Sequence, residues 1–204
     1  MYRQAILRAV LFLSAAALWW VAYTQPFWRV TLWAPQYPQG LQVIVYLHRV
    51  EGDVPEINLL NHYIGMGHVD RAAELERQYA WVGLLVLSLL GVAALGPFRP
   101  VRWLALAGAW AFPVVFLGDL YYWLYQYGHR LDPHAPIRIR PFTPPLVGTG
   151  KIAQFQAVAT LEVGFWIALA AALLVTIGFM LLRGQARPLR VPASAPVSIG
   201  EGAG

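Results

Sequence analysis

Four long apolar stretches dominate this chain and limit what it can fold into. A helix that crosses a bilayer needs about 20 consecutive, mainly apolar residues. Stretches that approach or exceed this length occupy residues 6–23, 80–98, 103–125 and 156–182. Only 12% of the 204 residues are charged, which is about half the share in soluble domains. The sequence therefore predicts an all-α membrane protein with four transmembrane helices and a small extracytoplasmic β-hairpin or loop region.

The distribution of arginine predicts the orientation of these helices. Basic residues stand before the first stretch, in the short turn between the second and third, and after the fourth: Arg3, Arg8, Arg99, Arg102, Arg183, Arg187 and Arg190. Cytoplasmic segments of membrane proteins carry an excess of Lys and Arg. Aromatic residues follow the first stretch where a cleavable signal would have small ones, so we expect an uncleaved anchor. Both termini should then be cytoplasmic.

The remaining segments form two loops and a tail around a membrane domain that spans residues 1–183. In the first outer loop, residues 24–79, two segments rich in β-branched and aromatic residues (28–33 and 41–48) predict a β-hairpin. The second outer loop, residues 126–151, contains five prolines and should be an extended strap. Residues 184–204 are rich in Pro, Ala, Ser and Gly, which predicts a disordered cytoplasmic tail.

Residues 58–68 of the first outer loop concentrate the metal-binding chemistry of the chain. His62 and Met66 are four residues apart and would share one face of a helical turn. Two glycines nearby would let the backbone bring His68 to the same point, and His48 could add a further ligand. Imidazole and thioether ligands together suit copper(I). The alternative is a compact hydrogen-bonded loop without metal, in which Met66 only packs.

Other classes of chemistry find little support. The chain has no cysteine, which excludes disulfides, thiolate zinc sites, iron–sulfur clusters and covalently attached haem. All five histidines lie outside the apolar stretches, so a haem b protein is not expected. No nucleophile, nucleotide-binding or dinucleotide-binding motif is present, and no basic patch suits nucleic acid. We therefore expect a protein that is not itself an enzyme and has no nucleic-acid partner.

Two acidic residues, Asp119 and Glu162, fall inside the predicted membrane stretches. Carboxylates at that depth are costly, so they should face inward and be paired. Candidate partners are Arg29, Arg130, His129 and His134, or the two carboxylates could share a proton. They could serve a proton or cation path, form a pair of ligands beneath the histidine loop, or act as a structural clamp between helices and loops. The two outer loops should pack together above the helices, with both carboxylates beneath them.

Three segments, residues 41–66, 127–137 and 144–155, resemble a known family. The most specific is Leu60-Asn61-His62-Tyr63-Ile64-Gly65-Met66. The chain is similar, over about three quarters of its length, to the small polytopic membrane accessory proteins encoded with atypical, Sec-exported nitrous oxide reductases. The resemblance implies a protein of the bacterial inner membrane that works with a periplasmic copper enzyme or other membrane accessory subunits. It would serve maturation of that enzyme, or supply it with copper or electrons.

Two other functions are compatible with the same residues. The chain could be a membrane subunit of a respiratory electron-transfer complex that docks a quinol or a cytochrome. It could also be a structural assembly factor that binds no metal.

Overall fold

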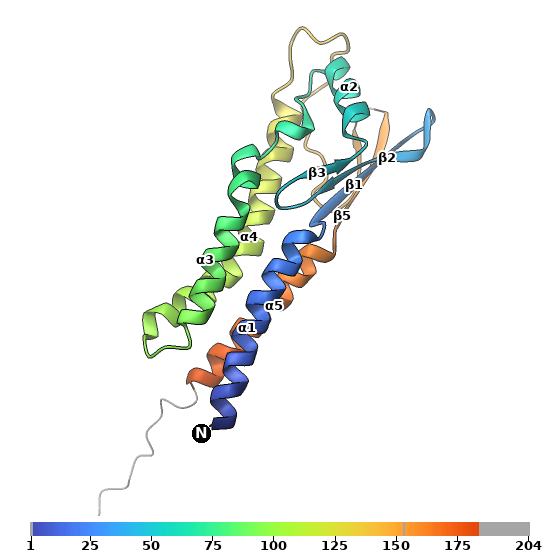
Figure 1. Cartoon of the computed structure of the whole chain (residues 1–204). Helices are drawn as coiled ribbons and strands as arrows, with labels where there is room; N and C mark the ends of the chain where they lie inside the picture. The colour runs from blue at the N-terminus through green and yellow to red at the C-terminus, as the bar shows by residue number, and fades with distance from the viewer. Residues whose placement is uncertain (1, 153, 184–204) are drawn as a thin grey trace, which may run out of the picture.

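The computed structural model describes residues 2–152 and 154–183, so the predicted disordered tail lies outside the described residues. Four of its helices are long and apolar enough to cross a membrane, as predicted. The elements, in chain order, are α1 (Tyr2–Thr24), β1 (Trp28–Ala34), β2 (Tyr37–Val45), β3 (Val50–Gly52), α2 (Val54–Ile64), a 3-10 turn η1 (Val69–Arg71), α3 (Glu74–Ala93), α4 (Arg99–His129), β4 (Gly148–Ile152), β5 (Phe155–Leu161) and α5 (Val163–Arg183). The long helices extend to one side of a sheet, and α2 lies at the opposite end of the molecule (Figure 1).

The prediction of an all-α protein with one small hairpin is wrong. A five-stranded antiparallel sheet, in the order β3-β2-β1-β5-β4, stands at one end of the helices. The expected hairpin is present as β1 and β2, with Val30 opposite Val43. Its second edge pairs with β5, where Val30 faces Ala159. A two-stranded ribbon alone is marginally stable, and the added strands give the central strand β1 a partner on each side.

The pairing of β1 with β5 also determines which helices are neighbours. α1 leads into β1 and β5 leads into α5, so antiparallel pairing of the strands places the two helices side by side (Figure 1). The backbone N–H of Gly164 donates to the carbonyl oxygen of Pro26 at 2.8 Å, where the strands pass into the helices. A Cβ at Gly164 would lie 2.7 Å from that oxygen, so glycine permits this close approach.

Two apolar cores follow from this arrangement. Between the helices, Phe12 and Trp19 of α1 are buried against small residues of α5, including Ala168 and Ala171. At the sheet, alternate residues on one face are buried together with Ile57 of α2 and Leu120 of α4; these are Trp28, Val30, Leu41, Val43, Ala157 and Ala159. The alternation follows from the pleat, which points successive side chains to opposite faces. The opposite face carries polar residues such as Arg29, Gln42 and Gln156.

Two predicted helix boundaries change as a consequence. The fourth membrane stretch was expected to begin at residue 156, but α5 begins at Val163 because the preceding residues form β5. The third stretch was expected over residues 103–125, whereas α4 is a 31-residue helix that runs from Arg99 to His129. The segment between α4 and α5 therefore starts and ends later than predicted and contains β4 and β5, and its irregular part covers residues 130–147.

Candidate functional site

The histidine segment forms the end of α2 and the turn that follows it. α2 ends at Ile64, and Gly65 adopts a left-handed conformation with φ of 78°. The N–H of Met66 then donates to the carbonyl oxygen of Asn61 at 2.9 Å. This is the usual way in which a glycine terminates a helix. The expectation that His62 and Met66 share one helical face is wrong, because the helix ends two residues before Met66.

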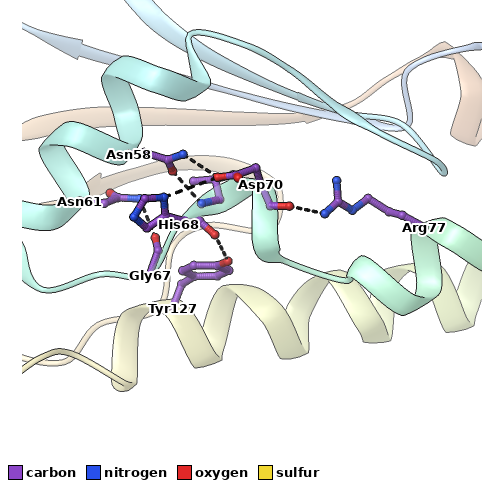
Figure 2. Close-up of polar contacts among 8 residues, drawn as sticks. Asn58, Asn61, Gly67, His68, Asp70, Arg77 and Tyr127 are labelled. Carbon is purple, nitrogen blue, oxygen red and sulfur yellow. Dashed lines mark hydrogen bonds and ion pairs between the residues drawn. The ribbon is translucent and has the colours of Figure 1, made fainter.

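Two asparagines of α2 hold the turn in place (Figure 2). The side-chain amide of Asn58 donates to the Asp70 carboxylate at 2.6 Å, while its oxygen accepts the backbone N–H of Val69 at 2.8 Å. The buried Asn61 donates to the carbonyl oxygen of Gly67 at 3.1 Å. The hydrogen bond from Asn58 keeps the pKa of Asp70 below its usual value. The turn after α2 is therefore compact and internally hydrogen-bonded.

Contacts from two long helices fix the far side of the same turn (Figure 2). The Tyr127 hydroxyl of α4 donates to the carbonyl oxygen of His68 at 2.5 Å. The guanidinium of Arg77, from α3, donates to the carbonyl oxygen of Asp70. The His68 ring lies 3.8 Å from the Asp70 carboxylate and remains about half exposed. The backbone of the histidine turn is therefore attached to both helices, while its imidazole stays accessible.

The Pro-rich strap packs directly against the histidine segment, as predicted. The N–H of Asp132 donates to the carbonyl oxygen of Gly65 at 2.9 Å, and the N–H of Ile137 donates to that of Tyr63 at 2.9 Å. A Cβ at Gly65 would approach the Asp132 backbone to 2.8 Å, so the glycine is needed for this contact as well as for its positive φ. Segments more than 60 residues apart thus form one surface.

That surface exposes apolar side chains at the end of the molecule opposite the N-terminus (Figure 1). Leu59 and Tyr63 of α2 are 52% and 46% exposed, and Ile137 of the strap is 53% exposed. His62, also exposed, lies on the same outward face of α2. The solvent-facing side of an amphipathic helix is ordinarily polar. We call Leu59, His62, Tyr63 and Ile137 the α2 patch.

The other predicted histidine ligands lie elsewhere. His48 is in the turn between β2 and β3, where its ring stacks on Tyr23 of α1 at a centroid distance of 4.4 Å. Burial, followed by the neighbouring Arg49 charge, lowers the pKa of His48. His129 ends α4 and stacks on Tyr125 at 3.9 Å. Among residues 2–152 and 154–183, no group of three His, Asp or Glu side chains could hold a metal ion together.

Glu162 does not lie where the sequence predicted it. It precedes α5 and therefore does not lie inside a membrane helix. Its carboxylate lies 3.0 Å from the Arg29 Nε and accepts a hydrogen bond from Thr160 at 3.2 Å. Arg29 was among the expected partners. Because Arg29 points to the polar face of the sheet, this ion pair and Asp119 lie on opposite sides of the sheet.

Asp119 lines a cavity that sequence reasoning missed. The cavity has a volume of about 330 Å³ and lies between the apolar face of the sheet, α3 and α4. Its walls are almost entirely apolar, and the charged residues among them are Asp119, Glu76 and Arg77. No local sequence signal marks this cavity, because strands, a turn and two helices from separate parts of the chain enclose it.

Comparison with known proteins gives no independent assignment: no protein-family model matches the chain, and no curated protein matches it.

Proposed function

We propose that the chain is a membrane accessory protein that docks a periplasmic copper enzyme of nitrous oxide respiration and assists its copper supply or maturation. The α2 patch is the observation that carries the docking function. The resemblance of the histidine segment to accessory proteins of nitrous oxide reductases supplies the identity of the partner.

The physical argument for docking starts from the cost of exposed apolar surface. Exposure of Leu59, Tyr63 and Ile137 leaves apolar area in water, which costs about 25 cal/mol per Å² relative to burial. Large apolar side chains exposed together on one outward face are typical of interaction sites. The hydrogen bonds from the strap to α2 fix the patch before a partner arrives, so little ordering entropy opposes association.

His62 gives the patch a metal-binding group. Its exposed imidazole lies beside Leu59 and Tyr63 on α2, where an interface would surround it. His68 and Met66 lie on the adjoining turn, and these ligand types favour copper(I). We propose that copper is held transiently by this loop and that ligands of the docked enzyme complete its coordination.

This function requires the sheet end to face the periplasm. The arginines before α1 and between α3 and α4 favour that orientation through the positive-inside rule. Reporter fusions after the short turn that follows α3 should be active only as cytoplasmic reporters. Periplasmic activity at that turn would contradict the orientation.

A deletion strain tests the functional assignment. Without this chain, the periplasmic nitrous oxide reductase should be exported but contain less copper and reduce less nitrous oxide. Expression of the parent chain should restore both quantities. Full copper loading of the reductase in the deletion strain would contradict the assignment.

A further inference from the structure

We propose that the cavity between the sheet, α3 and α4 binds a membrane-soluble quinol, with the Asp119 carboxylate accepting a hydrogen bond from a quinol hydroxyl group. This site is separate from the α2 patch, since the two sets of residues have no member in common.

The walls of the cavity suit a flat ring with an apolar tail. Val43 and Val50 come from the sheet, while Phe112 and Phe116 come from α4, which is a candidate membrane helix. Its volume of about 330 Å³ falls within the range of small-molecule sites. Aromatic side chains favour offset-stacked or edge-to-face contact with another ring.

The cavity is open on the side of Gly83. A Cβ placed on this α3 residue would meet nothing within 4 Å, although Gly83 is one of the lining residues. Because α3 is a candidate membrane helix, the proposal places this opening at the bilayer. A molecule dissolved in the membrane can therefore reach the cavity without crossing water.

An acceptor and a donor on α4 supply the hydrogen bonds to the headgroup. Asp119 supplies carboxylate oxygens, and Trp123 follows one helical turn later on the same face of α4. The indole nitrogen of Trp123 is buried without a hydrogen bond of good geometry in the described part of the chain, although it interacts with Asp119. A quinol hydroxyl can donate to the carboxylate and accept from the indole, so one group satisfies both.

The charges of the lining argue against a phospholipid headgroup. Asp119 and Glu76 would repel its phosphate. Arg77 is the one basic side chain among the lining residues, and its guanidinium is engaged by the backbone carbonyl oxygens of Asp70 and Ala73. A neutral headgroup that donates hydrogen bonds avoids this repulsion.

The test uses the full-length protein in nanodiscs and the quinol of a decyl-substituted benzoquinone as the probe. Trp28 and Trp123 both line the cavity, so binding is followed by quenching of tryptophan fluorescence and checked by calorimetry. The parent should bind in the micromolar range. Gly83→Leu should weaken binding about tenfold or more by filling the cavity, whereas Gly118→Leu is the matched control, because a Cβ at Gly118 also meets open space but outside the cavity.

Asp119→Ala tests recognition of the headgroup and does not depend on the folding of the Gly83 variant. Because the variant removes the charged acceptor of the hydrogen bond, quinol binding should weaken by roughly tenfold or more. Binding of decylbenzene, which lacks the hydroxyl groups, should not weaken. The proposal is overturned if the parent does not bind the quinol, if Gly83→Leu binds like the parent, if Asp119→Ala weakens both probes equally, or if a co-purified phospholipid occupies the cavity and the quinol cannot displace it.

Discussion

The indole nitrogen of Trp28 donates a 2.6 Å hydrogen bond to the carbonyl oxygen of Leu146, which lies 118 residues later in the chain. Trp28 opens β1 and is buried in the sheet core, while Leu146 lies at the end of the Pro-rich strap, just before β4. This bond fastens the strap to the sheet. The strap in turn contacts the histidine segment through backbone hydrogen bonds.

Replacing Trp28 with Phe should therefore loosen the strap. The aromatic ring is largely retained, but the donor is lost and the Leu146 carbonyl loses its partner, at a cost of about 1–3 kcal/mol. Hydrogen exchange followed by mass spectrometry should show faster exchange in residues 131–147, with the long helices unchanged. Trp33→Phe, on the opposite face of β1, is the control. Equal exchange in the two variants would contradict the role assigned to this bond.

The Asn58–Asp70 contact predicts how the histidine turn responds to acid. The pKa of Asp70 is lower in the folded protein than the usual value of about 3.9. Its stabilising contribution is thus present above that usual value and is lost as the pH falls through the lowered pKa. Protection of amides in residues 65–71 should decrease below about pH 4.

Asn58→Ala removes the hydrogen bond that lowers the pKa of Asp70. Amide protection in residues 65–71 should therefore be weaker in this variant already at neutral pH, and it should change less between neutral and acid pH than in the parent. Glu74→Gln, at the exposed start of α3, is the control. Unchanged protection in Asn58→Ala would show that the turn does not depend on this contact.

The lowered pKa of His48 predicts a second pH effect, at a pH closer to neutral. Its pKa is lowered from the usual value of about 6.5, first by burial and then by the Arg49 charge. The neutral ring is favoured in the folded state, so its contribution is complete above about pH 6.5 and is lost as the pH falls toward the lowered pKa. The thermal unfolding temperature should fall between about pH 7 and pH 5 in the parent, and less so in His48→Gln. Parallel pH profiles would exclude His48 as the cause.

Much of the fold could be predicted from local patterns, and the missed parts have clear causes. The four apolar helices and the β1–β2 hairpin were each encoded by a continuous segment. β5 was not recognised, because its alternating residues run directly into α5 and the two together read as one apolar stretch. Its partner β1 lies about 130 residues earlier, and no local pattern reports such a pairing. The position of Glu162 was wrong for the same reason.

The candidate site was predicted in part. Association of the histidine segment with the strap is confirmed, whereas the shared helical face of His62 and Met66 is not, because Gly65 ends the helix in a left-handed conformation. Gly65 was interpreted as a residue that makes the backbone of the turn flexible, but it also terminates the helix. The α2 patch was not predicted, because the sequence alone does not show which side of α2 faces the core. In the structure Ile57 and Asn61 are buried, so Leu59 and Tyr63 face outward.

Copper binding remains a prediction, and titration of the purified protein with copper(I) tests it. The parent should bind copper(I) in preference to zinc, and His62→Ala should abolish binding because it removes an imidazole ligand. Met66→Leu, which is close in volume, should weaken copper(I) binding without affecting the fold. Binding should also weaken below about pH 6, because imidazole must be neutral to coordinate a metal. Equal binding by His62→Ala and the parent would exclude this imidazole as a ligand.

The central claim is that the α2 patch docks the copper reductase. The most direct test is the dissociation constant between the purified chain in nanodiscs and its nitrous oxide reductase. The double variant Leu59→Lys, Ile137→Glu places charges on two exposed positions of the patch and should weaken the complex about tenfold or more. The control Gln156→Lys, exposed on the polar face of the sheet, should bind like the parent. Equal affinity of the double variant and the parent, or no complex with the parent, would contradict the account.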